Sequence, residues 1–312
     1  MSAATEHTRP MVRLMEQLGP DEGYNLTALP SVRVLRSNRP LTRTPVLYEP
    51  GIVILCQGRK RGYLGEQLYL YDAQHYLVVA LPVPFTMETD ASAEEPMLAL
   101  YLQLDVAMAV RLVEQADAAA MLPRAEPRGM FSSPMEPALA QSVLRLLEAL
   151  CQPADAQVLG PALLRELYYR VLTGEQGGSL RAALDGHGRF GQIQRAINLI
   201  HARYPEPLAV EVLAEAACMS VPSFHLHFRA VTDNTPLQYL KSTRLHQARL
   251  LMLRGALNAQ AAAYQVGYQS PSQFSREFKR FFGRSPQAEV QRMRAAYALP
   301  PPSEAQRYVS SH

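Results

Sequence analysis

The chain has 312 residues, of which 48% are hydrophobic and 19% are charged. This balance is typical of a folded protein with room for two domains, and it excludes an intrinsically disordered chain. No apolar run reaches the roughly 18 to 20 residues that a membrane-spanning helix requires. The opening MSAATEHTRPMVRLMEQLGPDEG lacks the apolar core of a secretory signal. We therefore expect a cytoplasmic protein without membrane contact.

The charge is unevenly distributed along the chain. Residues 1–188 contain 16 Lys and Arg against 21 Asp and Glu, whereas residues 189–294 contain 14 against 6. A basic segment that follows an acidic one is typical of a nucleic-acid-binding domain joined to a partner domain. A solvated basic surface would give the same counts, so charge leaves both interpretations open.

Residues 31–105 predict a compact β domain. Four short runs are rich in Val, Ile, Leu and Tyr: GIVILCQG, QLYLYD, HYLVVALPV and PMLALYLQLD. Gly and Pro residues separate them, as turns require. Strands this short and this closely spaced favour a small barrel or sandwich.

After residue 105 the apolar residues change to helical spacing. Two amphipathic helices are predicted, in SPMEPALAQSVLRLLEALCQ and LGPALLRELYYRVL. Their apolar faces consist of Leu139, Val143, Leu146, Leu147, Leu150, Leu163, Leu164, Leu167, Tyr168 and Val171. These faces can pack within the chain or on a second copy of it, and we expect a homodimer interface.

The three cysteines are Cys56, Cys151 and Cys218. Their odd number and wide spacing argue against a disulfide framework and against a Cys-rich zinc site. We expect each to be a small buried hydrophobic residue. A redox- or electrophile-sensing thiol at Cys56 stays open as an alternative.

From residue 189 onward the chain repeats itself at an offset of 50. The matching pairs are Ser220 with Ser270, Phe224 with Phe274, Phe228 with Phe278, and Pro236 with Pro286. A repeat of this length implies two copies of one supersecondary unit.

Each copy predicts a helix-turn-helix: a short helix at 208–219 or 258–268, a turn, and a second helix capped by serine. Ala217 and Gly267 are expected in the two turns, and Asp233 and Gly283 after the second helices. A generic helical bundle is the alternative, but it requires neither the repeat nor the basic face.

A helix of about eighteen residues is predicted between Pro236 and Arg254. Its expected packing stripe is Leu237, Leu240, Leu245, Ala248 and Leu251. Such a helix is about 27 Å long at ~1.5 Å per residue, close to the ~34 Å of one DNA turn. One chain can therefore hold two reading helices about one turn apart and bind two successive major grooves.

The two second helices present different faces. In residues 271–282 we expect Phe274, Phe278 and Phe281 to form the apolar stripe. The opposite face offers Ser272, Gln273 and Arg276 to base edges, and Lys279, Arg280 and Arg284 to phosphates. The first copy offers Pro222, Ser223, His225, Leu226 and Arg229, of which Leu226 suits a thymine methyl. His225 and His227 point apart on a helix, so we expect no metal site.

The segments RLHQARLLM, AYQVGYQSPSQFSREFKRFFGRSPQ and CMSVPSFHLHFRAVTDNTPLQYL resemble the DNA-binding domain of the AraC/XylS family of transcription regulators. The resemblance implies that Arg276 contacts a base, with Pro271 and Ser272 as neighbouring contacts. Leu226 occupies the equivalent place in the first unit, a departure that leaves His225 and Pro222 as its candidate readers. Asp233 in place of the usual Gly is a second departure.

The stretch VLYEPGIVILCQGRKRGYLGEQLYLYDAQHYLVV resembles the cupin-like effector domain of one AraC-type subgroup. The resemblance implies a small-molecule pocket inside the barrel. The candidate polar contacts are Tyr48, Gln57, Lys60, Arg61, Tyr69, His75 and Tyr76. For each of them a structural role is the alternative.

The predicted fold is α+β and multidomain. An N-terminal extension (1–30) precedes a cupin-like effector-sensing and dimerisation domain with a helical pair (31–173), and a Gly-rich linker follows (174–188). An all-α DNA-binding domain with two helix-turn-helix units joined by a long helix (189–298) precedes a disordered tail (299–312).

We expect a sequence-specific transcription regulator that binds double-stranded DNA, contacts RNA polymerase and senses a small-molecule effector. It is expected to be no enzyme and to require no cofactor. One alternative keeps the DNA-binding module but switches it through Cys56. Another is a metal-dependent cupin enzyme with a helical appendage, which needs several histidines where the β region has only His75.

Overall fold

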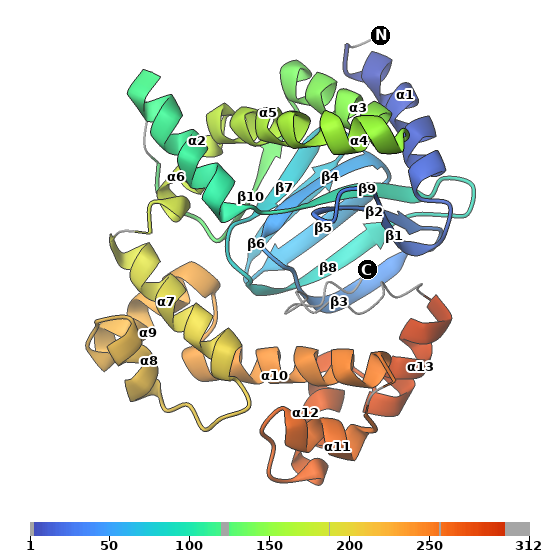
Figure 1. The fold of residues 1–312 in the computed structure, drawn as a ribbon. Coiled ribbons are helices and arrows are strands. Elements are labelled where there is room, and N and C mark those ends of the chain that lie inside the picture. Colours follow the sequence, from blue (N-terminus) through green and yellow to red (C-terminus); the bar gives the residue numbers. More distant parts are fainter. Residues whose placement is uncertain (1–2, 120–124, 187, 256, 297–312) are drawn as a thin grey trace.

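The computed structural model describes residues 3–119, 125–186, 188–255 and 257–296. Figure 1 shows a curved β-sheet with helices over one side of it and a second group of helices along the other. The predicted disordered tail lies outside the described residues. Within them, no helix has both the length and the hydropathy needed to cross a bilayer.

The N-terminal domain is built on one antiparallel sheet. Its strands are β1 (Gly23–Leu26), β2 (Val32–Ser37), β3 (Leu41–Leu47), β4 (Gly51–Gln57), β5 (Arg59–Leu64), β6 (Gln67–Asp72), β7 (His75–Val79), β8 (Pro84–Asp90), β9 (Met97–Gln103) and β10 (Met130–Pro134). Their order is β1-β2-β9-β4-β7-β6-β5-β8-β3, and β10 pairs with β7. The predicted β domain is confirmed and is a half-barrel.

A helical layer lies over one side of this sheet and consists of α1 (Ala3–Leu18), α2 (Val106–Ala119), α3 (Pro137–Leu150), α4 (Pro153–Val158), α5 (Gly160–Thr173) and α6 (Gly177–Leu184). The central strand β4 is buried from Gly51 to Cys56, because helices lie on one face and the barrel interior on the other. This explains why GIVILCQG reads as a continuous apolar run rather than an alternating one.

Two flanking segments are more ordered than the sequence indicated. Helix α1, within the predicted N-terminal extension, contacts α3, β4 and β9 and buries Met11 and Met15. The predicted linker contains α6, whose Leu180 and Ala183 are buried. The domain boundaries at residues 31 and 174 stay predictions.

The apolar faces predicted for a homodimer are used inside the chain. Helices α3 and α5 contact each other, and nine of the ten residues named for these faces are buried, while Leu163 is half-buried. The proposed dimer therefore loses the observation on which it was based.

The C-terminal domain is all-helical: α7 (Gly188–Arg203), α8 (Val210–Ala216), α9 (Val221–Thr232), α10 (Pro236–Leu253), α11 (Ala259–Gln265), α12 (Pro271–Phe282) and α13 (Pro286–Ala296). Helix α10 spans 18 residues, as predicted, and contacts β3 and β8 of the N-terminal sheet. Its predicted packing stripe is only partly correct, because Leu237 is 53% exposed and Leu251 is half-buried.

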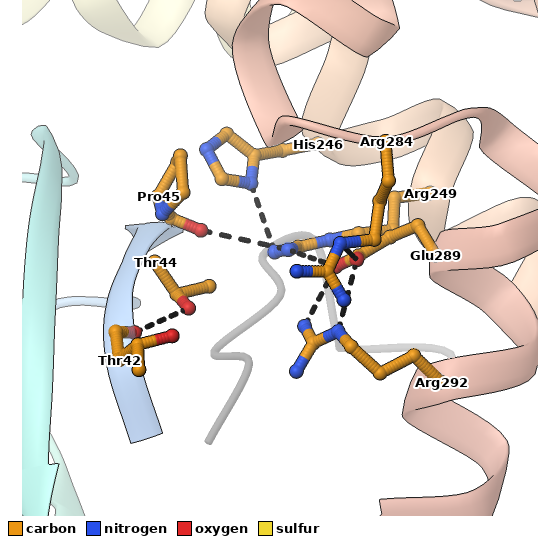
Figure 2. Close-up of polar contacts among 8 residues, drawn as sticks. All are labelled: Thr42, Thr44, Pro45, His246, Arg249, Arg284, Glu289 and Arg292. Atoms are coloured by element: carbon orange, nitrogen blue, oxygen red, sulfur yellow. Dashed lines mark hydrogen bonds and ion pairs between the residues drawn. The ribbon is translucent and has the colours of Figure 1, made fainter.

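Helix α10 buries polar residues as well as apolar ones, because other elements surround it. Its Arg249 is completely buried, and its guanidinium lies 4.4 Å from the centre of the Phe282 ring. Arg249 Nη1 donates to Glu289 Oε1 of α13 at 3.4 Å and to the Pro45 carbonyl of β3 at 3.5 Å. One side chain thus joins both domains (Figure 2).

Glu289 is the anion of this cluster. It also pairs with Arg292 at 2.9 Å and with Arg284 at 3.7 Å, and the three guanidinium groups converge on it in Figure 2. Burial raises the pKa of this carboxyl, but the hydrogen bond from Arg292 and the charges of the three arginines outweigh burial and leave the pKa below the ordinary 4.5.

We predict that Glu289→Gln lowers the free energy of unfolding by about 3 kcal/mol at neutral pH, because it removes the carboxylate partner of a buried arginine. A depressed native pKa stabilises the fold above the unfolded-state pKa, and this contribution disappears as the pH falls through the native value. The difference between wild type and variant should therefore shrink on acidification below pH 4.5. Denaturant titrations across pH measure it, with the exposed Glu215→Gln as control; a pH-independent difference contradicts the prediction.

Candidate nucleic-acid interface

Helices α9 and α12 have the same burial pattern at an offset of 50. Phe224 and Phe228 are buried in α9, as Phe274 and Phe278 are in α12. Between these positions both helices expose the face that was predicted to read DNA. The repeated unit in the sequence is therefore a repeated unit in space.

The ends of the two helices are built differently. Ser270 Oγ accepts a hydrogen bond from the backbone N–H of Gln273 at 3.3 Å and caps α12. Ser220 takes the corresponding place before α9, but its side chain makes no capping hydrogen bond. Gly283 ends α12 at φ 78°, and Asp233 ends α9 in the same left-handed region at φ 54°. Aspartate adopts this region less readily than glycine but more readily than most other residues, so Asp233 ends α9 at a modest cost.

The turn of the first unit does not align with the second turn as predicted from the sequence. The left-handed residue of the second turn is Gly267 at φ 93°, and its counterpart is Cys218 at φ 52°, not Ala217. The short helices and turns match at an offset of 49, because the second unit has one additional residue before its cap. Only glycine fits at 267, since a Cβ would overlap the Pro205 carbonyl.

On α12 the predicted base-reading side chains are accessible. Ser272, Gln273 and Arg276 are exposed, as are the predicted phosphate contacts Lys279 and Arg280, while Pro271 is half-buried. Arg284 is exposed but pairs with Glu289, so its guanidinium already has a carboxylate partner within the domain. The apolar stripe is Phe274, Phe278 and Phe282; Phe281 is half-buried and packs on His246 at the side that faces the N-terminal domain.

On α9 the reading face is less polar. Leu226 is 68% exposed at the place that Arg276 takes in α12. Pro222, His225 and Arg229 are exposed beside it, and Ser223 is half-buried. Among the described residues, no group of His, Cys, Asp and Glu could hold a metal ion.

The residues predicted to contact an effector do not all lie in one place. Tyr48 and Lys60 meet in the buried barrel interior, where Lys60 Nζ lies 3.3 Å from the Tyr48 hydroxyl and burial lowers the pKa of Lys60 to about 7. Arg61 lies on the opposite face of β5, paired with Glu88 and Asp90, as alternation along a strand requires.

The remaining candidates lie elsewhere. Gln57 donates to the Pro96 carbonyl, and His75 pairs with Asp72 at the start of β7. Tyr76 is buried close to Gly174 below the helical layer, and Tyr69 bonds Gln67 in the same strand, β6. Of the seven candidates, Tyr48 and Lys60 are therefore the two that meet as one cluster.

The cysteines differ in environment. Cys56 is buried in β4, and burial raises the pKa of its thiol to about 12. Because the thiolate is the reactive form, this environment does not favour a redox or electrophile switch at Cys56. The expectation that all three cysteines are buried is wrong, because Cys151 is half-buried and Cys218 is exposed.

Sequence reasoning missed the contacts between the two domains. The turn between β5 and β6 lies against the end of α9: a Cβ on Gly65 would come within 2.6 Å of the Asp233 carboxyl carbon. The backbone of Gly65 also lies in the left-handed region, at φ 59°. The close approach thus combines the aspartate that ends α9 with a glycine in the N-terminal domain, two residues whose pairing no local pattern reveals.

A cleft of about 670 Å³ opens beside this contact. Arg43 of β3 and Lys241 and Arg280 of the C-terminal domain line it, together with the aromatic side chains Tyr63, Phe85 and Phe281 and the carboxylate of Asp233. The Arg43 guanidinium lies 4.1 Å from the centre of the Tyr63 ring, and its Nε donates to Thr86 Oγ1 at 3.2 Å. The cleft is therefore amphipathic and mainly cationic.

Residues 28–179 match the family described as AraC-type transcriptional regulator N-terminus, and residues 213–292 match a helix-turn-helix domain family. The chain is an AraC-family transcriptional regulator. It is similar to AlkR of Acinetobacter baylyi, 44% identical over 96 residues that cover 30% of this chain and 31% of that protein. It is also similar to the activator RhaS of Escherichia fergusonii, 28% identical over 148 residues that cover 47% and 52%.

The chain thus matches about a third to a half of the length of these curated relatives. The fold is that of ToxT from Vibrio cholerae. An apo structure of a ToxT single-residue variant superposes with a TM-score of 0.56 at 12% identity, covering 84% of this chain and 97% of that one. A second ToxT structure contains a bound unsaturated fatty acid and covers 89% and 99%, with a TM-score of 0.50 at 12% identity.

Membership of this regulator family confirms the prediction that the chain is not an enzyme. The matches equally confirm the predicted two-part architecture, with an AraC-type N-terminal domain and a helix-turn-helix domain.

We predict that Gly65→Ala destabilises the chain by about 1 to 3 kcal/mol more in wild type than in an Asp233→Gly background, because the new Cβ meets the Asp233 carboxylate. Denaturant unfolding of the four proteins in this cycle measures the coupling. Gly283→Ala is the matched control, since Gly283 has a similar φ but no neighbour within 4 Å and so reports strain alone. Additive effects of the two substitutions contradict the contact.

Proposed function

We propose that this AraC-family regulator binds two successive major grooves of double-stranded DNA with α9 and α12 of a single chain. The observation that carries the proposal is the repeated exposure of these two helices on either side of α10. Helix α10 has a length of about 27 Å, and it is buried along most of its length. Two reading helices held by one long helix can enter two major grooves that lie about one turn apart.

The two heads are proposed to read DNA by different chemistry. Arg276 can donate two hydrogen bonds to guanine, whereas Leu226 can only make apolar contact, for which the thymine methyl is suited. The half-site contacted by α12 should therefore carry the stricter hydrogen-bonded sequence requirement. Lys279 and Arg280 are proposed phosphate contacts that add affinity without sequence information.

We further propose that the N-terminal domain controls DNA binding in response to a small anionic, amphipathic effector held in the cleft between the domains. Its cations come from both domains and its walls are aromatic, so a carboxylate with an apolar body fits it. The fatty acid bound to ToxT belongs to this chemical class. Such a ligand would join Arg43 to Arg280 and so compete with DNA phosphates for Arg280.

RNA polymerase and a second copy of the chain are further proposed partners, and the proposed place of action is chromosomal DNA in the cytoplasm. A homodimer has to use surfaces other than the apolar faces of α3 and α5, because those faces are buried inside the chain.

We predict that Arg276→Ala weakens binding to a selected operator by about 1 to 3 kcal/mol and relaxes the preference for one base pair. Lys279→Ala should weaken binding to all sequences alike and reduce the salt slope by about one. Fluorescence anisotropy with an operator obtained from a random duplex pool, and with its single-base variants, measures both. Equal loss of base preference in the two variants would show that the assigned roles are wrong.

For the effector, we predict that oleate below its micelle concentration raises the thermal unfolding temperature of the full chain and lowers its affinity for DNA. Oleyl alcohol should do neither, because it lacks the anion. Arg43→Met should abolish the response, whereas Arg39→Met, which removes an exposed arginine paired with Glu22, should keep it. A response to the alcohol, or one that survives Arg43→Met, contradicts the cleft as the effector site.

A further inference from the structure

Glu277 lies beside the reading face of α12, and both of its carboxylate oxygens accept hydrogen bonds within the domain. Its Oε2 accepts from the Tyr268 hydroxyl at 2.9 Å, and its Oε1 accepts from Lys241 Nζ at 3.2 Å. Oε1 also accepts from Nε2 of Gln273, one helical turn earlier, at 3.3 Å. The carboxylate thus connects α12 to α10 and to the turn before α12, and one of the predicted base readers is attached to it.

The charge state of Glu277 determines what it can accept. Burial raises the pKa of this carboxyl, but the hydrogen bonds from Tyr268, Gln273 and Lys241 and the charge of Lys241 outweigh burial, so the pKa lies below the ordinary 4.5. At neutral pH Glu277 is therefore a carboxylate, which accepts hydrogen bonds and donates none.

The carboxylate of Glu277 fixes the orientation of the side-chain amide of Gln273. A glutamine amide has a donor end and an acceptor end, and only the donor end can face a carboxylate. The flipped amide would place two oxygens against each other. Gln273 is exposed on the reading face, so its carbonyl oxygen and the second N–H of its amino group remain for a base edge, and the direction of the carbonyl is fixed.

We propose that Glu277 is a positioning residue that locks the Gln273 amide, so that α12 selects a base carrying an exocyclic amino group at the position Gln273 contacts. This inference rests on the proposed function of α12 as a DNA-reading helix. In the major groove adenine and cytosine present amino groups, whereas guanine and thymine present the acceptors O6 and O4. A fixed carbonyl pairs with the first two and is repelled by the second two.

A free glutamine has no such preference, because it turns its amino end towards guanine or thymine when they are present. Glu277 therefore converts an adaptable reader into a selective one. The first unit has no equivalent device, since Ser223 and His227 occupy the corresponding positions. This difference supplies an internal control, because base preferences in the half-site of α9 should not depend on Glu277.

The test is a selection of binding sites from a random duplex pool by the full chain, followed by anisotropy on single-base variants. Wild type should prefer adenine or cytosine at one position of the α12 half-site by about tenfold. Glu277→Gln should reduce this preference about threefold or more, because glutamine both donates and accepts and tolerates either orientation of Gln273. The first half-site should keep its preferences.

Two further variants separate positioning from folding. Tyr268→Phe removes one bond to Glu277 but leaves the contact with Gln273, so it should keep the base preference even if it lowers the unfolding temperature. In a Gln273→Ala background Glu277→Gln should have no effect on base preference, because the reader is absent.

Retention of the full preference by Glu277→Gln overturns the inference, as does an effect of Glu277→Gln that persists in the Gln273→Ala background. Preferred guanine or thymine at the Gln273 position overturns it as well. Failure of the wild type to select any sequence instead overturns the proposed function, and the inference with it, so the two failures are distinguishable.

Discussion

Helix α10 is the constraint on which the rest of the molecule depends. It has to pack both helix-turn-helix units and the N-terminal sheet at once, so almost no side of it is left for water. That is why it buries His246 and Arg249 alongside leucines, and why Arg249 needs the carboxylate of Glu289. A buried guanidinium without an anion is costly; with one, it binds α10, α13 and β3 together. The distance and orientation between the two reading helices follow from this packing.

The two helix-turn-helix units connect differently to the N-terminal domain. Phe224 and Phe228 of the first unit, with Tyr239 of α10, belong to the same continuous hydrophobic core as the β-sheet, whereas Phe274 and Phe278 of the second unit belong to a separate core. The Tyr239 hydroxyl also donates to the carbonyl of Pro82 before β8. A change in the half-barrel can therefore reach α9 through the shared core, and α12 through its contact with β3 and through α10.

Local pattern was sufficient for much of the fold and for the reading faces. The offset of 50, the prolines and the serine caps identify the helix-turn-helix units because each depends on residues only a few positions apart. Glu277 follows Gln273 by four positions, so helical spacing alone predicts that the two side chains meet. Phe281 was misplaced because Phe281 and Phe282 are adjacent, and the packing of α12 on α10 decides which of them is buried.

Contacts between distant segments were beyond such reasoning. The approach of Gly65 to Asp233 joins residues 168 positions apart, and neither has a local signal for the other. The Arg249 bond to the Pro45 carbonyl depends on backbone geometry that any residue could supply. The homodimer expectation failed to gain support for the same reason: an apolar helical face shows that something covers it, and the covering element here is the chain itself.

We propose that a single chain binds two successive grooves with two reading helices held apart by α10. Hydroxyl-radical footprinting of the full chain on its selected duplex, with the binding stoichiometry measured in parallel, tests this most directly. One chain per duplex should protect two patches on the same face of the DNA, centred about one helical turn apart. A single protected patch, or two patches that appear only when two chains are bound, would contradict it.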